Sequence, residues 1–194
     1  MTAFQGACVW LMDAAWIVWL GVWIALSRRV KNVARRESMA QRAAHIIPMG
    51  VAGALLFFGS RAGDTWLEHR VLPRAAWMAP AGLAVVLAGL AIAIWARVIL
   101  AGNWSGTVTL KQDHELVQTG PYRFARHPIY TGLLTAVLGT AIAIDELRGP
   151  LALLITAVAF IRKMQTEEAF MNDAFGSRYA LYKTRVAALI PGIW

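Results

Sequence analysis

Residues 120–144 read GPYRFARHPIYTGLLTAVLGTAIAI, and the rest of the chain can be interpreted outward from them. The first half of this stretch places Arg123, Arg126 and His127 beside two prolines, and an uninterrupted apolar run follows directly. Proline is favoured in the first turn of a helix, so Pro128 predicts a helix that continues through the apolar run. A basic turn against an apolar helix is typical of the boundary between membrane and water.

The composition also indicates a membrane protein. Of the 194 residues, 58% are hydrophobic and the mean hydropathy is +0.52, whereas soluble domains are about 45–50% apolar. The net charge of +8 would suggest nucleic-acid binding in a soluble protein. Because the chain is so apolar, a charged membrane face is the better interpretation, and we expect no nucleic-acid partner. Cys8 is the single cysteine, which excludes an internal disulfide.

Five apolar segments are candidate membrane helices: 3–26, 45–59, 77–99, 129–144 and 150–161. A spanning helix needs about 20 apolar residues, so the first and third segments are long enough and the others are short. The linker 145–149 is tight, which predicts a helical hairpin between the last two segments. The first segment lacks the basic start and cleavage site of a signal peptide, so we expect it to be retained in the membrane.

The loop charges predict the orientation. Six lysines and arginines occupy the linker 27–44 against Glu37 alone, which predicts a cytoplasmic loop by the positive-inside rule. Five spans then place the N-terminus outside, and residues 100–128 and everything after residue 161 in the cytoplasm. Asp13 is the only charge in the first segment, and the sequence assigns it no role.

The last 33 residues differ from the apolar segments. Large apolar side chains recur there at three- and four-residue spacing: Met171, Phe175, Tyr179, Tyr182 and Val186. This spacing predicts an amphipathic helix with a bend at Gly176, which either lies on the membrane surface or covers a site. The predicted fold is therefore all-α and polytopic, with about five transmembrane helices and a C-terminal amphipathic helix.

Common cofactor and metal motifs are absent from the sequence. No glycine-rich dinucleotide or phosphate loop occurs. His114 and Glu115 begin like a zinc-protease motif, but Gln118 occupies the last histidine position, so we expect no metal. Polar residues gather instead in 103–130 and 162–168. Without further information, the two glutamates that end the second stretch would be a solvated face paired with Arg162 or Lys163.

Three blocks of the second half occur in a fixed order: NWSG (103–106), DHELVQTGPYRFARHPIYTG (113–132) and EEAFMNDAFGSRYALYKTRVAALIPGIW (167–194). Together they resemble the isoprenylcysteine carboxyl methyltransferase family and the related phospholipid N-methyltransferases. The matching elements are His-x-Leu-Val, Gly-x-Tyr, Arg-His-Pro-x-Tyr before a membrane helix, and then Glu-Glu, Phe-Gly and spaced tyrosines. The resemblance covers roughly residues 100–194, and the earlier part matches only in being membrane helices.

The resemblance implies one integral-membrane methyltransferase domain over residues 1–194. Residues 1–99 would supply N-terminal membrane helices and residues 100–194 the cofactor-binding half. The methyl donor would be S-adenosyl-L-methionine, released as S-adenosyl-L-homocysteine, held between the last membrane helices and the C-terminal helix. Carried over by motif, the cofactor-binding residues are Thr107, His114, Glu115, Leu116, Val117, Tyr122, His127, Pro128, Ile129, Tyr130 and Glu167.

The chemistry of these side chains suits that donor. Glu167 suits its ammonium group, and Arg126 and His127 suit its carboxylate or an anionic substrate. We assign catalytic roles to Arg126 and Lys163, and substrate binding to Lys163 and Arg162. The family usually has an arginine at the position of Lys163, and lysine keeps the charge without the two-pronged hydrogen bond.

We therefore predict methyl transfer to a lipid-soluble small-molecule acceptor at the cytoplasmic membrane face, with a prenylcysteine-like carboxylate as the first candidate. N-methylation of a phospholipid amine and S-methylation of a small thiol stay open. The amine reaction would need a base, such as Glu168, His127 or Tyr130. Outside this class, a small membrane transport protein and a sterol-reductase-like enzyme with a nicotinamide cofactor are the alternatives.

Overall fold

The computed structural model describes residues 2–28, 33–58, 65–73, 75–104, 109–111 and 115–192. These residues form six α-helices: α1 (Ala3–Ser27), α2 (Met39–Phe58), α3 (Met78–Leu100), α4 (Pro128–Ile144), α5 (Arg148–Phe175) and α6 (Ser177–Arg185). Short 3-10 helices lie at η2 (Trp66–Glu68), η3 (Ala101–Asn103) and η4 (Gly120–Arg123). Strands β1 (Val33–Arg36) and β2 (Thr109–Lys111) pair in a small antiparallel sheet. The predicted all-α class is confirmed.

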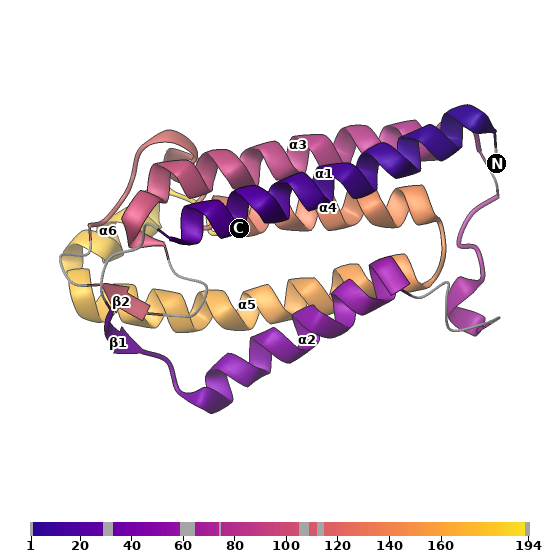
Figure 1. Ribbon diagram of the computed structural model, residues 1–194. Helices are drawn as coiled ribbons and strands as arrows, with labels where there is room; N and C mark the ends of the chain where they lie inside the picture. Colours follow the sequence, from indigo (N-terminus) through magenta and orange to yellow (C-terminus); the bar gives the residue numbers. More distant parts are fainter. Residues whose placement is uncertain are drawn as a thin grey trace.

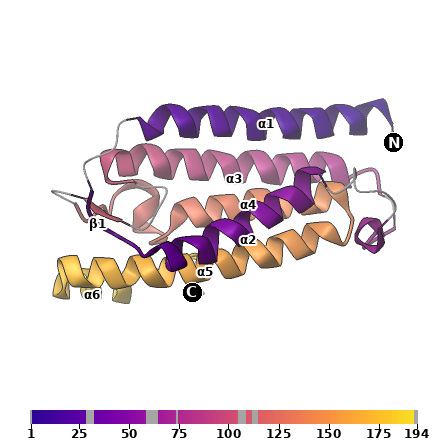
Figure 2. The same ribbon diagram turned by 60° about the horizontal axis from the view of Figure 1, so that its bottom comes forward.

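The long helices lie side by side. Figure 1 shows α1, α3 and α4 together, with α2 and α5 beside them, and Figure 2 shows α1 outermost against α3. Helix α3 packs on α1 and α4, and α5 packs on α2 and α4. The sheet and α6 gather at one end of the bundle, and the α4–α5 turn lies at the other (Figure 1).

Three helices are long and apolar enough to cross a membrane: Ala3–Ser27, Met39–Phe58 and Met78–Asn103. Helix α4 is apolar but shorter, at 17 residues. Much of the outer surface of α1 is apolar, with Trp10, Ile17 and Val18 at least 63% exposed. Such a surface suits lipid and not water, and the chain is an integral membrane protein. Five full spans stay a prediction.

Helix α5 differs from the sequence-based expectation. The segment 150–161 and the polar residues after it are one continuous helix of 28 residues, not two separate helices. The chain turns at Gly176, whose φ of 51° favours glycine, so the predicted bend is confirmed. Only the nine residues of α6 follow, and Val186 lies beyond its end. The apolar half and the polar half of α5 are therefore held in one rigid element.

Glycines set the distance between α3 and α4. A Cβ on Gly89 would lie 2.5 Å from the carbonyl oxygen of Gly132, and one on Gly139 would lie 2.6 Å from that of Gly82. Small residues let helix backbones approach in membranes, where dispersion contacts replace the hydrophobic effect. This close packing fixes the start of α4, and with it His127.

The α4–α5 connection is the predicted hairpin. Asp145 ends α4 in the left-handed conformation and binds Arg70. Arg148, at the start of α5, donates hydrogen bonds to the carbonyl oxygens of Leu55 and Leu56 at 2.9 and 3.0 Å. These bonds satisfy carbonyl groups in the last turn of α2, so one arginine ties two helices together at this end.

Candidate active site

The start of α4 is the anchor of the candidate site. Pro128 begins the helix, as predicted, and His127 precedes it as the N-cap residue. The backbone N–H groups of Arg126 and His127 donate to the carbonyl oxygens of Ala187 and Ala188 at 2.8 and 3.0 Å. This pairing holds the C-terminal segment, residues 186–192, against the start of α4. About 60 residues separate the two paired stretches in the sequence.

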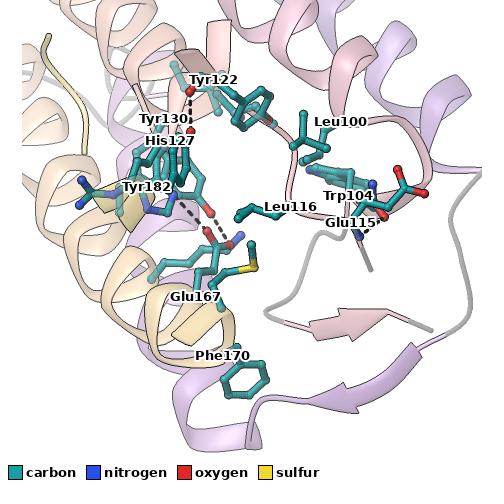
Figure 3. Close-up of a pocket in the computed structure, with 18 of the residues that line it drawn as sticks. Leu100, Trp104, Glu115, Leu116, Tyr122, His127, Tyr130, Glu167, Phe170 and Tyr182 are labelled. Atoms are coloured by element: carbon teal, nitrogen blue, oxygen red, sulfur yellow. Dashed lines mark hydrogen bonds and ion pairs between the residues drawn. The ribbon is translucent and has the colours of Figure 1, made fainter. Parts of the chain in front are cut away.

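Glu167 of α5 faces the first turn of α4. Its carboxylate accepts a hydrogen bond from the Tyr130 hydroxyl at 2.6 Å and lies 3.5 Å from Nδ1 of His127. The His127 and Tyr130 rings stack with centroids 5.6 Å apart, and Tyr130 stacks on Phe160 at 4.5 Å. Residues three apart share a helix face, which explains how His127 and Tyr130 reach the same carboxylate (Figure 3).

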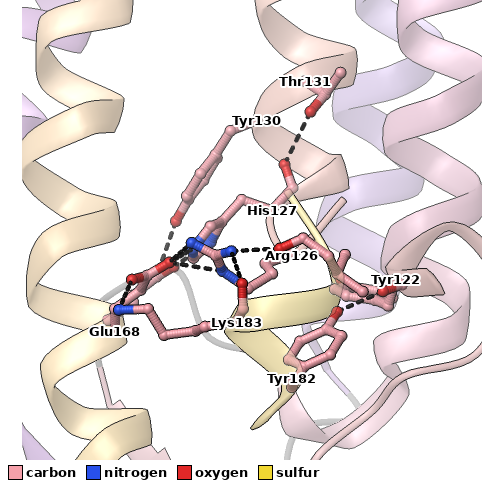
Figure 4. Close-up of polar contacts among 10 residues, drawn as sticks. Tyr122, Arg126, His127, Tyr130, Thr131, Glu168, Tyr182 and Lys183 are labelled. Atoms are coloured by element: carbon pink, nitrogen blue, oxygen red, sulfur yellow. Dashed lines mark hydrogen bonds and ion pairs between the residues drawn. The ribbon is translucent and has the colours of Figure 1, made fainter. Parts of the chain in front are cut away.

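Glu168 binds a different set of partners. One oxygen accepts from Nε and Nη2 of Arg126 at 2.9 and 2.7 Å, and the other lies 2.8 Å from Nζ of Lys183. Arg126 also donates to the carbonyl oxygens of Lys183 and Val186 (Figure 4). Arg126, just before α4, and Glu168 of α5 therefore both bind α6 or the residue that follows it. These contacts hold the end of the chain against α4 and α5.

His127 lies between the two carboxylates, with Nε2 3.3 Å from Glu168. Burial disfavours the imidazolium, but hydrogen bonds to Glu167 and Glu168 outweigh it and raise the pKa of His127. Burial likewise opposes charge on both glutamates, yet His127 and the nearby cations lower the pKa of each. The two carboxylates thus favour the imidazolium form of His127. The expectation of a solvated face is wrong for these glutamates, whose side chains are only 26% and 16% exposed and lie against His127.

A cavity of about 240 Å³ opens beside this cluster. Its charged wall comprises Arg126, His127, Lys163 and Glu167. Its apolar wall comes from membrane helices and comprises Trp19, Trp23, Met49, Leu133 and Phe160. Figure 3 shows Leu116 between Glu167 on one side and Trp104 with Glu115 on the other. One space therefore offers both ion-pairing groups and an apolar surface.

Most of the residues singled out in the sequence meet at this cavity. Its lining includes Glu115, Leu116, Val117, Tyr122, Arg126, His127, Ile129, Tyr130, Lys163 and Glu167. Pro128 is buried in the first turn of α4 and supports the wall without lining it. Thr107 and His114 lie outside the residues that the structure describes.

Arg162 lies apart from Lys163. Successive residues of an α-helix are rotated by about 100°, so Lys163 is buried in the cavity while Arg162 is exposed in a second groove between α2 and α5. The two cations were expected to bind one substrate together. The structure separates them: Lys163 lines the cavity, with Nζ 5.6 Å from the centre of the Tyr130 ring, and Arg162 does not line it.

The comparisons with known proteins agree with this geometry. The family model for phospholipid methyltransferases matches residues 77–178, more than half of the chain. The chain belongs to the phospholipid methyltransferase family. The match covers α3, α4 and α5, and so includes His127, Lys163 and Glu167.

The relatives of this phospholipid methyltransferase family member confirm the resemblance to isoprenylcysteine carboxyl methyltransferases. The chain is 34% identical over 123 residues to protein-S-isoprenylcysteine O-methyltransferase A of Arabidopsis thaliana, covering 59% of this chain and 60% of that protein. It is 26% identical over 167 residues to the cobalt-zinc-cadmium resistance protein CzcN of Cupriavidus metallidurans, covering 86% and 69%. The solved structure of a eukaryotic intramembrane Ras methyltransferase, ICMT, is 26% identical with a TM-score of 0.55, covering 82% of this chain and 55% of that one.

Several residues in or beside the cavity of this family member belong to no recognisable sequence motif. The tilted rings of Trp19 and Trp23 in α1 lie with their centroids 5.0 Å apart, and their four-residue spacing was the only sequence signal that they share a face. Arg97 is 1% exposed, donates to the carbonyl oxygen of Leu26 at 2.6 Å, and lies 4.4 Å from the Trp104 ring. It thereby braces the tryptophan wall, which no local pattern could predict.

Proposed function

We propose that this protein is an integral membrane methyltransferase that takes its methyl group from S-adenosyl-L-methionine and passes it to a lipophilic acceptor. The observation that carries the proposal is the divided cavity. A polar wall with a glutamate, a histidine and a lysine meets an apolar wall built from membrane helices. A polar cofactor and a lipid-soluble acceptor need these two surfaces in one place.

The residues present fit the cofactor. Its ammonium group suits Glu167, and its carboxylate suits the His127 imidazolium. Leu116 and Val117 offer apolar contacts for adenine. When bound, S-adenosyl-L-methionine supplies an electrophilic methyl group for an in-line displacement. The side chains of this protein would align that group with the acceptor and exclude water, and the position of the cavity beside α5 and α6 suits both tasks.

The ion pairing within the site favours an acceptor that needs no base. A carboxylate is already a nucleophile, whereas a phospholipid ammonium must first lose a proton. The Nδ1 and Nε2 atoms of His127 both lie within 3.5 Å of carboxylate oxygens, and Glu168 is ion-paired with Arg126 and Lys183. Both are therefore poor bases. We infer that the acceptor is a prenylcysteine-like carboxylate, and that the buried ammonium of Lys163 binds it.

We further propose that the whole of residues 1–194 forms one domain with the site on the cytoplasmic face. The cofactor is a polar cytosolic molecule, and strand β1, which belongs to the basic linker 27–44, lies at the same end of the bundle as α6 and the site. Single cysteines at Gln41 and Trp66, in a chain without Cys8, test this with a membrane-impermeant reagent on intact cells. Only position 66 should react. Labelling at position 41 alone would reverse the orientation.

Methyl transfer is the direct test of the acceptor. The purified protein, in vesicles with S-adenosyl-L-methionine labelled in its methyl group, would receive either an N-acetylated S-prenylcysteine or phosphatidylethanolamine. The label should enter the prenylcysteine as a base-labile methyl ester. Label in phosphatidylethanolamine alone would instead identify an amine acceptor, and no label in either lipid would remove the proposal.

A further inference from the structure

The second groove lies between the N-terminal end of α2 and the polar half of α5. It encloses about 370 Å³. Its lining comprises Gln41, Ala44 and His45 from α2, and Arg162, Gln165, Thr166 and Ala169 from α5. None of these residues lines the cavity described above. The groove is thus a separate feature on the other side of α5.

The polar side chains of the groove favour an anion. Arg162 is exposed and presents up to five N–H donors, and Gln165 adds an amide. The side-chain oxygen of Gln41 accepts from the backbone N–H of Ser38 at 2.9 Å, which leaves its amide N–H groups to donate. No carboxylate occurs among the described lining residues. Glu37, whose carboxylate lies 3.6 Å from Nε2 of His45, is buried with it.

An exposed apolar strip leads to this anion-favouring groove. Leu154 and Val158 of α5 are 61% and 48% exposed. They precede Arg162 by eight and four residues, so all three share one face of the helix. At 1.5 Å per residue the strip extends about 12 Å before the arginine. After Arg162 in the sequence, the same face of α5 continues with Gln165 and Ala169.

This order of side chains matches the order of groups in a phospholipid. An acyl chain needs an apolar strip, and the phosphate at its end needs a cation where the apolar surface stops. Arginine is well suited to phosphate because its planar fork can donate two parallel hydrogen bonds. Basic residues at the membrane boundary also attract anionic lipids electrostatically.

We propose that this groove binds an anionic phospholipid, with its phosphate at Arg162 and an acyl chain along Leu154 and Val158. The lipid is a ligand that supports the protein and is not the methyl acceptor. The proposal gives Arg162 a role outside the cavity. Because Lys163 and Glu167 line the cavity from the same helix that borders the groove, a bound lipid would hold α5 in the position that shapes the cavity.

Lipid binding can be measured without any methyl transfer. The protein in nanodiscs of phosphatidylcholine, with or without phosphatidylglycerol, would be released into a mass spectrometer and scored for retained phosphatidylglycerol, alongside its melting temperature. We expect retention and a higher melting temperature with phosphatidylglycerol. Arg162→Gln should reduce retention about fivefold, the usual effect of one basic residue at an anionic surface. Ala169→Phe should reduce it similarly, since it fills the groove without changing any charge.

Arg178→Gln is the matched control, because Arg178 is also an exposed arginine but lies on α6, outside the groove. It should retain the lipid like the parent protein. Equal losses in the Arg162 and Arg178 variants would overturn the proposal, since they would indicate unspecific charge attraction. Equal retention of phosphatidylcholine, or the same rise in melting temperature with inorganic phosphate alone, would also overturn it.

Discussion

Replacement of Glu167 by glutamine tests the charged wall of the cavity. Glutamine has the same shape, and its amide oxygen can still accept from the Tyr130 hydroxyl, which lies 2.6 Å from the carboxylate. The change therefore removes the negative charge while the cavity keeps its form. His127 keeps Glu168 as a second anionic partner at 3.3 Å, so the local fold should survive.

The expected loss follows from the role we assign to this charge. A hydrogen bond to a charged group contributes about 1.5–3 kcal/mol. If Glu167 binds the ammonium of the cofactor, Glu167→Gln should weaken S-adenosyl-L-homocysteine binding about 10- to 150-fold. The upper part of this range is favoured, because the carboxylate is partly enclosed, with 26% of its side chain exposed.

Isothermal titration calorimetry with S-adenosyl-L-homocysteine in detergent measures this affinity. Glu146→Gln is the matched control, since Glu146 pairs with Arg148 at the α4–α5 end of the bundle, far from the cavity. It should bind like the parent protein. Unchanged affinity in a well-folded Glu167→Gln protein would refute our placement of the cofactor.

Three further predictions follow from the same geometry. Lys163→Ala should leave the affinity for S-adenosyl-L-homocysteine within about twofold of the parent protein but lower the initial rate of methyl transfer to a carboxylate acceptor. Lys163→Arg should retain that rate. Loss of cofactor binding in both variants would show that Lys163 binds the cofactor and not the acceptor. His127 has a raised pKa, so its ion pairs stabilise the fold below its unfolded pKa of about 6.5 and are lost as pH rises through the folded pKa. The melting temperature should therefore fall with rising pH in the parent protein and vary less in His127→Gln; parallel profiles would contradict this. Gly139→Leu should destabilise the protein by about 1–3 kcal/mol through overpacking, whereas Gly21→Leu, with nothing within 4 Å of its Cβ, should not; denaturation midpoints compare them.

Local features of the sequence predicted most of the fold. Pro128 predicted the start of α4, and the tight linker 145–149 predicted the hairpin. The continuity of α5 was not predictable, because two adjacent glutamates after an apolar run usually mark a new, solvated element. Their charges are neutralised instead by His127 and Arg126, which come from a distant part of the chain.

Only the residues of the candidate site that belong to sequence motifs could be predicted. The resemblance singled out most of the charged wall, including His127 and Glu167. The second wall was missed, because Trp19 and Trp23 follow no motif and face the cavity only through the packing of α1 on α3. Arg162 was misplaced beside Lys163, although the rotation between neighbouring helical residues already argued for opposite faces.

An experimental density map of the protein with S-adenosyl-L-homocysteine tests the central claim most directly. The account predicts density in the cavity between α4, α5 and the C-terminal segment, with the ligand's amino group within hydrogen-bond distance of Glu167. The adenine should contact Leu116 and Val117. Density confined to the groove beside Arg162, or an amino group bound away from Glu167, would contradict the account.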